Sequence, residues 1–255
     1  MNPKFMIGVY GRFDADRIAR ELRPNFAGIE ASCFRSIEEA QQVSAYIKGR
    51  GIALGVHFPL VRDRYPGIEL HPMLTSRNRS ERDLAVSAIG QALAECAGLG
   101  ARYLIVHYPK PALLAQGLDW SDWRFAQKGE AVFADEEVLA EEESLAYWAF
   151  SRLEGLSREF GVQVVVEHDI LHSLHYRHLI RRLFEEYPRL GFCVDTGRLH
   201  MLEQTDPEFK PVEFIKMMNP WVGNVHLWAV QVGKNKQGGH HPVLPELQKE
   251  DGWGD

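Results

Sequence analysis

The sequence predicts a single-domain (β/α)8-type TIM barrel over residues 1–255 that lacks its eighth strand. Short apolar runs alternate with longer helix-like segments along the chain. Several of the helix-like segments stop at a glycine directly before the next apolar run, as expected for turns from helix to strand. The length of 255 residues also suits this fold, because α/β barrels use about 250 residues as one domain.

Seven apolar runs are predicted to be parallel strands buried on both faces, because they are hydrophobic throughout rather than alternating. In chain order they are Phe5–Tyr10, Phe26–Ala31, Ile52–Phe58, Ala101–Tyr108, Val162–His168, Leu190–Thr196 and Val222–Trp228. A closed barrel has eight strands, and no further apolar run follows Trp228. We therefore expect a barrel that is open at this seam, cut short, or completed by another chain.

Helical periodicity fills the segments between these runs, which indicates βαβ units and a parallel sheet. The expected helices are Ser36–Arg50, Arg79–Gly98, Asp135–Phe160, Leu174–Tyr187 and Pro211–Met218. Residues 109–134, with Trp120 and Trp123, are predicted to form a long active-site lid. An open doubly wound sheet is the alternative fold. It is less favoured because no glycine-rich phosphate turn follows the first strand.

Composition and charge narrow the classes of function. The net charge of −6 argues against a nucleic-acid partner, since phosphate binding normally shows as a basic excess. No apolar run reaches the ~18 residues of a membrane span, and the first residues lack the pattern of a signal peptide. The three cysteines have no C-x-x-C spacing, as in a reducing compartment. We expect a cytoplasmic protein, and a homo-oligomer is compatible with the sequence.

Polar residues lie near the carboxyl ends of five consecutive strands. They are His57, His107, Glu167 with His168, Asp195, and His226. In a parallel barrel these ends converge on one mouth, where catalytic residues sit. A carboxylate after an apolar stretch needs a metal, an arginine or a dense hydrogen-bond shell. Histidine, aspartate and glutamate together form a ligand set for Zn²⁺, Mn²⁺ and related ions. Each histidine taken alone is more often a structural residue, and Glu30, which ends the second run, is expected in an ion pair.

Four segments resemble the xylose isomerase-like TIM-barrel superfamily, which includes sugar phosphate isomerases and epimerases and the endonuclease IV group. They are VVVEH, FCVDTGRLH, NVHLW and GGHHPVLPE. The resemblance implies that Glu167, Asp195 and His226 hold a divalent metal such as Mn, Zn, Mg or Co. The endonuclease branch of the superfamily implies His57 and His107 as further ligands.

The sequence departs from the family pattern in two places. Arg198 stands where the family often has a histidine. Because arginine stays protonated it cannot ligate metal, but it binds phosphate or carboxylate well. We predict that it holds an anionic group of the substrate. The family's metal-binding glutamate on strand eight has no counterpart, which puts full coordination and turnover in question.

These observations predict a metal-dependent isomerase or epimerase acting on a small polyol, sugar, sugar phosphate or related hydroxy-carbonyl compound. The predicted catalytic residues are Glu167, His168 and His107. The predicted substrate contacts are His57, Arg198, His240 and Trp123, although His240 and His241 are equally well interpreted as exposed loop residues. Two alternatives stay open: a metal-dependent phosphoesterase of the apurinic endonuclease type, and a barrel without catalytic activity.

Overall fold

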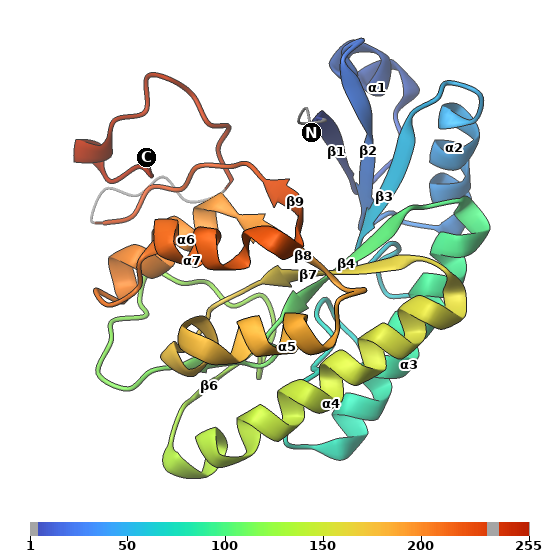
Figure 1. Ribbon diagram of the computed structural model, residues 1–255. Coiled ribbons are helices and arrows are strands. Elements are labelled where there is room, and N and C mark those ends of the chain that lie inside the picture. The colour runs from blue at the N-terminus through green and yellow to red at the C-terminus, as the bar shows by residue number, and fades with distance from the viewer. Residues whose placement is uncertain (1–4, 234–239, 255) are drawn as a thin grey trace.

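Seven parallel strands form one curved sheet in the computed structural model of the protein, which describes residues 5–233 and 240–254. The order across the sheet is β1-β2-β3-β4-β7-β8-β9, and the sheet curls into an incomplete barrel (Figure 1). The strands are β1 (Phe5–Tyr10), β2 (Phe26–Ser32), β3 (Ala53–His57), β4 (Tyr103–Tyr108), β7 (Gln163–His168), β8 (Gly191–Asp195) and β9 (Val222–His226). The prediction of a (β/α)8-type barrel without its eighth strand is confirmed for the described residues.

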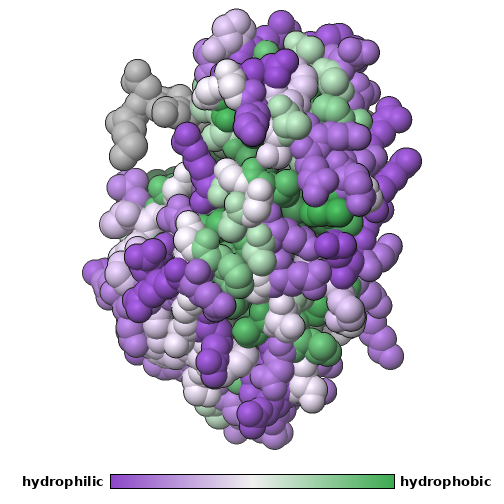
Figure 2. All heavy atoms as spheres, turned by 90° about the vertical axis from the view of Figure 1, so that its right-hand side faces the viewer, coloured by the Kyte–Doolittle hydropathy of each residue, from purple (hydrophilic) through white to green (hydrophobic). Residues whose placement is uncertain are grey.

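Helices connect the strands, and α3 packs between α2 and α4 along the outer side of the sheet. The helices are α1 (Ala15–Glu21), α2 (Ile37–Ile47), α3 (Arg79–Leu99), α4 (Glu136–Phe160), α5 (Ile180–Glu186), α6 (Thr196–Thr205) and α7 (Pro211–Met218). A π-helical turn, His175–Leu179, leads into α5. Figure 2 shows this side of the molecule as mostly hydrophilic, with hydrophobic atoms in the seams. No helix in the described residues has the length and apolar composition that crossing a membrane requires.

Two helices, α1 and α6, are absent from the sequence-based expectation. The reason that α6 was not expected lies in the double role of Asp195. The Asp195 side chain accepts a hydrogen bond from the backbone N–H of Arg198 at 2.8 Å, so the aspartate that ends the strand also caps the next helix. The expected lid over residues 109–134 is also more ordered than predicted, since it contains a small parallel pair, β5 (Ala112–Leu114) and β6 (Ala131–Phe133).

The period of the strands decides which residues face the barrel interior. Successive strand residues point to opposite faces of a sheet. A small apolar cluster of Tyr103, Ile105, Val165 and Cys193 fills the interior. Two residues further along the same strands come His107, Glu167 and Asp195. These polar side chains therefore form the next layer, at the carboxyl ends of the strands.

The barrel remains open between β1 and β9. Within the described residues neither edge pairs with an eighth strand. The chain after β9 instead makes two isolated antiparallel bridges, Ala229 with His241 and Gln231 with Trp253. His200 of α6 contacts the carbonyl oxygen of Gly252 at 3.1 Å. The last described residues thus pack back onto α6 beside the mouth.

Gly28 supports a close approach between β2 and β3. A Cβ atom at this position would lie 2.4 Å from the carbonyl oxygen of Ala53. We expect Gly28→Ala to lower the free energy of unfolding by about 1–3 kcal/mol, because the clash is with backbone. Urea denaturation measures the change. The matched control is Gly8→Ala on β1, where a Cβ meets nothing within 4 Å. Equal stability of the two variants would contradict the prediction.

Candidate active site

Glu167 lies at the centre of the polar layer. Its Oε2 atom is 3.1 Å from Nε2 of His57 and 3.1 Å from Nδ1 of His226. One ligand atom from each of these three residues lies within 4.8 Å of the others. Three strands, β3, β7 and β9, thus bring together residues that are up to 169 positions apart in the chain.

The hydrogen bonds of the two histidines show which nitrogen faces Glu167. Nδ1 of His57 lies 2.8 Å from the carbonyl oxygen of Phe58, which can only accept, so this nitrogen donates. Nε2 of His226 likewise faces Glu30 Oε1 at 3.0 Å, and the other oxygen of Glu30 accepts from the Tyr103 hydroxyl at 2.8 Å. In the neutral imidazoles the remaining nitrogens carry lone pairs that point toward the Glu167 carboxylate.

Lone pairs that converge on a carboxylate repel it unless a cation or protons lie between them. A metal-ligating histidine usually donates its second N–H to a carbonyl or carboxylate, as both imidazoles do here. The His57, Glu167 and His226 donor set therefore fits a divalent cation such as Zn²⁺ or Mn²⁺.

The electrostatics of the site favour positive charge at its centre. Burial alone would raise the pKa of Glu167, but the imidazoles of His107, His226 and His57 hold it well below its usual range. Burial alone would lower the pKa of His57, yet the Glu167 carboxylate raises it. The pKa of His226 is also raised despite burial, chiefly by hydrogen bonds to Cys193, Glu167 and Glu30. The field that favours a proton here also favours a metal ion.

His107 lies at the edge of this cluster. Its Nε2 is 3.1 Å from His57 Nε2 and 3.8 Å from Glu167 Oε1. Its Nδ1 is 3.2 Å from an acceptor, Asp169 Oδ2, and 3.2 Å from a donor, Arg198 Nη2. Burial, with the Arg198 charge, sets the pKa of His107 well below its usual value. Either tautomer of the neutral imidazole has a partner at Nδ1.

Asp195 joins three segments around the mouth. Its carboxylate caps α6 and accepts from the indole nitrogen of Trp228, which lies 2.7 Å from both oxygens. Gly197 allows this contact, because a Cβ there would lie 2.3 Å from the Trp228 ring. Asp195 Oδ2 is also 4.0 Å from His226 Nδ1. Burial and the nearby Glu167 charge raise the pKa of Asp195 to about 6. Asp195 thus lies beside the three clustered residues, but most of its bonds are structural.

A second buried cluster adjoins His107. Lys110 Nζ lies 2.5 Å from Asp169 Oδ2 and also pairs with Glu130. Arg198 Nη1 donates to Asp169 Oδ1 at 2.5 Å, and Arg198 Nε lies 3.4 Å from Glu167 Oε1. Arg198 therefore neutralises buried carboxylates, which is a different role from the predicted substrate clamp.

His71 completes this second cluster. Its Nε2 is 3.4 Å from Glu130 Oε1, and its ring centroid is 4.6 Å from that of His107. Burial and the Lys110 charge lower the pKa of His71 to about 4. None of the four residues His71, Lys110, Glu130 and Asp169 is among the site residues predicted from the sequence.

Three other predicted site residues lie apart from the Glu167 cluster. His168 follows Glu167 and so points to the outer face of the sheet, where its ring packs against Phe192 and Phe214. Burial lowers its pKa to about 4, and its Nε2 accepts from the backbone N–H of Asp195 at 3.0 Å. This geometry corrects its expected position at the mouth.

Trp123 and His240 have different surroundings. Trp123 is buried, and its indole donates to Thr205 Oγ1 at the end of α6, at 3.0 Å. His240 stacks on Trp228 with 3.8 Å between ring centroids, which places it beside Asp195. Gly238 and Gly239 of the GGHHPVLPE segment lie outside the described residues.

No protein-family model and no curated protein sequence matches the chain. Solved structures do match it. A D-tagatose 3-epimerase-like protein has a TM-score of 0.59 and 15% identity, covering 89% of this chain and 76% of that one. A xylose isomerase domain protein from Planctomyces limnophilus has a TM-score of 0.57 and 13% identity, with 92% and 77% covered. A mannonate dehydratase from Streptococcus suis serotype 2 has a TM-score of 0.57 and 11% identity, with 91% and 75% covered.

The fold is therefore that of the xylose isomerase-like TIM barrels, as the sequence resemblance implied. At such low identity the likeness concerns the fold. The neighbours with this fold include proteins named as sugar epimerases, isomerases and a dehydratase.

Proposed function

We propose that the protein is a divalent-metal-dependent isomerase or epimerase of a small sugar, sugar phosphate or related hydroxy-carbonyl compound. The observation that carries the proposal is the convergence of Glu167 with the lone pairs of His57 and His226. The fold neighbours named as sugar epimerases and isomerases support the substrate class.

The proposed roles follow from the contacts. Glu167, His57 and His226 would hold the ion, and Asp195 Oδ2 lies beside them for a fourth contact. A bound ion of Mn, Zn, Mg or Co would supply Lewis-acid polarisation of a carbonyl oxygen. His107 is the proton carrier of choice, because its Nδ1 faces both an acceptor, Asp169, and a donor, Arg198. When His107 gains or loses a proton at Nε2, its Nδ1 can still hydrogen-bond, to Asp169 as a donor or to Arg198 as an acceptor.

One observation favours a second candidate, the metal-dependent phosphoesterase. His71 and His107 lie side by side next to the Glu167 cluster, and additional imidazoles permit a second metal ion. The barrel without activity is the third candidate, because the described residues supply no carboxylate from an eighth strand.

Metal stoichiometry and a substrate screen test the proposal. We expect one tightly held divalent ion per chain by elemental analysis, and interconversion of ketoses or their phosphates that stops in chelator and returns with Mn²⁺ or Co²⁺. Two or three ions per chain with phosphodiester cleavage would establish the phosphoesterase instead. A protein without bound ion and without turnover after metal is added would contradict both enzymatic proposals.

A further inference from the structure

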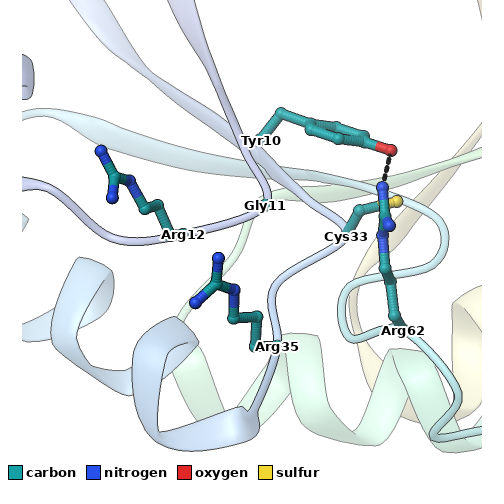
Figure 3. A pocket seen from close by; sticks show the side chains of 6 residues that line it. All are labelled: Tyr10, Gly11, Arg12, Cys33, Arg35 and Arg62. Carbon is teal, nitrogen blue, oxygen red and sulfur yellow. Dashed lines mark hydrogen bonds between the residues drawn. The ribbon is translucent and has the colours of Figure 1, made fainter.

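A hollow apart from the Glu167 cluster lies on the carboxyl-end face of the sheet, above β1, β2 and β3 (Figure 3). Its volume is about 290 Å³, and it is lined by Tyr10, Gly11, Arg12, Cys33, Arg35 and Arg62. Three of the six lining residues are arginines and none is a carboxylate. In a chain with a net charge of −6, such a concentration of positive charge points to a ligand with negative charge.

Hydrogen bonds between adjacent loops give this hollow a fixed frame. The backbone N–H of Gly11 donates to the carbonyl of Ser32 at 3.1 Å, and that of Cys33 donates to Pro59 at 2.8 Å. Arg62 N–H donates to the carbonyl of Phe34 at 2.9 Å. The chain after each of the three strands is thus tied to its neighbour, so the arginines stand on an ordered rim.

The guanidinium groups of this hollow have few acidic partners. Within the residues that the structure describes, the guanidinium groups of Arg35 and Arg62 form no ion pair with a carboxylate, although the backbone N–H of Arg35 donates to Glu39 at 3.0 Å, and the Arg12 side chain reaches only Asp14 at 3.8 Å. The Arg62 side chain donates to the Tyr10 hydroxyl and lies over the Tyr10 ring, 5.1 Å from its centroid. Figure 3 shows the guanidinium groups of Arg35 and Arg62 rising from neighbouring loops. Guanidinium groups without internal counter-charges are suited to bind phosphate oxygens.

The hollow and the Glu167 cluster share one face of the barrel. His57 ends β3, and Arg62 follows five residues later, so their Cα atoms are at most about 18 Å apart. This bound, with the length of the arginine side chains, permits one extended ligand to contact both the cluster and the arginines.

We propose that the substrate carries a phosphate group, which Arg12, Arg35 and Arg62 bind in this hollow while its carbonyl end meets the Glu167 cluster. The proposal rests on the proposed isomerase or epimerase function and specifies its substrate as a sugar phosphate. A dianionic phosphate matches three cations better than a single carboxylate does. The volume suits one phosphoryl group, and the acidic chain disfavours a nucleic-acid strand.

The test compares D-fructose 6-phosphate with D-fructose as calorimetric probes of the metal-loaded protein. We expect the phosphate ester to bind at least tenfold more tightly. Arg35→Gln should weaken its binding by about tenfold, the loss expected for one charge-assisted contact, and Arg12→Gln/Arg35→Gln should weaken it further. Binding of D-fructose should stay unchanged. The matched control, Arg181→Gln, removes an arginine paired with Glu185 on α5. It should change the binding of neither D-fructose 6-phosphate nor D-fructose.

Inorganic phosphate, titrated into chelator-treated protein, separates this proposal from the metal-dependent function. Binding that disappears in Arg12→Gln/Arg35→Gln supports the hollow as a phosphate site whether or not the protein holds an ion. The proposal is overturned if phosphate and its ester bind no better than D-fructose, or if the arginine variants bind them unchanged. Displacement of the ester by a short DNA duplex at equal concentration would also overturn it, in favour of a nucleic-acid surface.

Discussion

Glu167→Gln is expected to weaken divalent-ion binding by at least about 100-fold and to abolish turnover. Loss of a residue that only orients a metal ligand weakens binding by about 10–100-fold, and Glu167 is the central member of the cluster. Glutamine keeps the shape of the side chain but removes the charge that His57 and His226 share. Elemental analysis and titration with Mn²⁺ or Zn²⁺ measure the effect.

Thermal unfolding gives an independent readout of the same change. An ion at 100 times its dissociation constant stabilises the native state by about 2.7 kcal/mol, which for a chain of this size raises Tm by about 5–10 °C. We expect this rise for the natural protein and none for Glu167→Gln. Glu95→Gln is the control, because Glu95 is also a mostly buried carboxylate, bonded to Arg64 and Tyr65. A Glu167→Gln protein that still shows the full rise would remove Glu167 from the ligand set.

The strands and the central cluster could be predicted from the sequence because both follow from local pattern. Continuous apolar runs identify parallel strands, and a polar residue at the end of such a run lies at the mouth of a barrel when its side chain faces the interior. Glu167, His57 and His226 satisfy both conditions. The misplacement of His168 follows from neglecting the period of two along a strand. The same period identifies Asp169, which shares the face of Glu167.

For other parts of the site, the sequence contains no comparable local pattern. His71 and Glu130 lie in long connections between strands, whose course depends on tertiary packing, and only the folded chain brings them to His107 and Lys110. Lys110 is nearly fully buried in the structure, whereas its sequence neighbourhood resembles an exposed turn. The hollow of Arg12, Arg35 and Arg62 was not anticipated either, because its arginines follow three different strands. The three positive charges are brought together only in the folded chain, where β1, β2 and β3 lie side by side.

Asp169→Asn is expected to lower the free energy of unfolding by about 3–5 kcal/mol, the loss expected when one partner of a buried ion pair is removed. Asp169 is 3% exposed, and Lys110 is 1% exposed. The change would leave the charges of Lys110 and Arg198 in the interior without their shared carboxylate. Glu185→Gln is the control, since its ion pair with Arg181 is solvent-exposed and contributes less than about 1 kcal/mol.

A second variant and the pH dependence separate charge from packing in the Asp169 prediction. Lys110 keeps its ion pair with Glu130 after Asp169→Asn, so we expect Lys110→Met to cost less stability in that variant than in the natural protein, as a double-mutant cycle measures. Burial would raise the pKa of Asp169, but Arg198 and Lys110 hold it well below its usual range. Its stabilising contribution is therefore complete above about pH 5 and declines as the pH falls below the unfolded-state pKa. A stability difference between the natural protein and Asp169→Asn that stays constant down to pH 2 would assign the loss to packing rather than to charge.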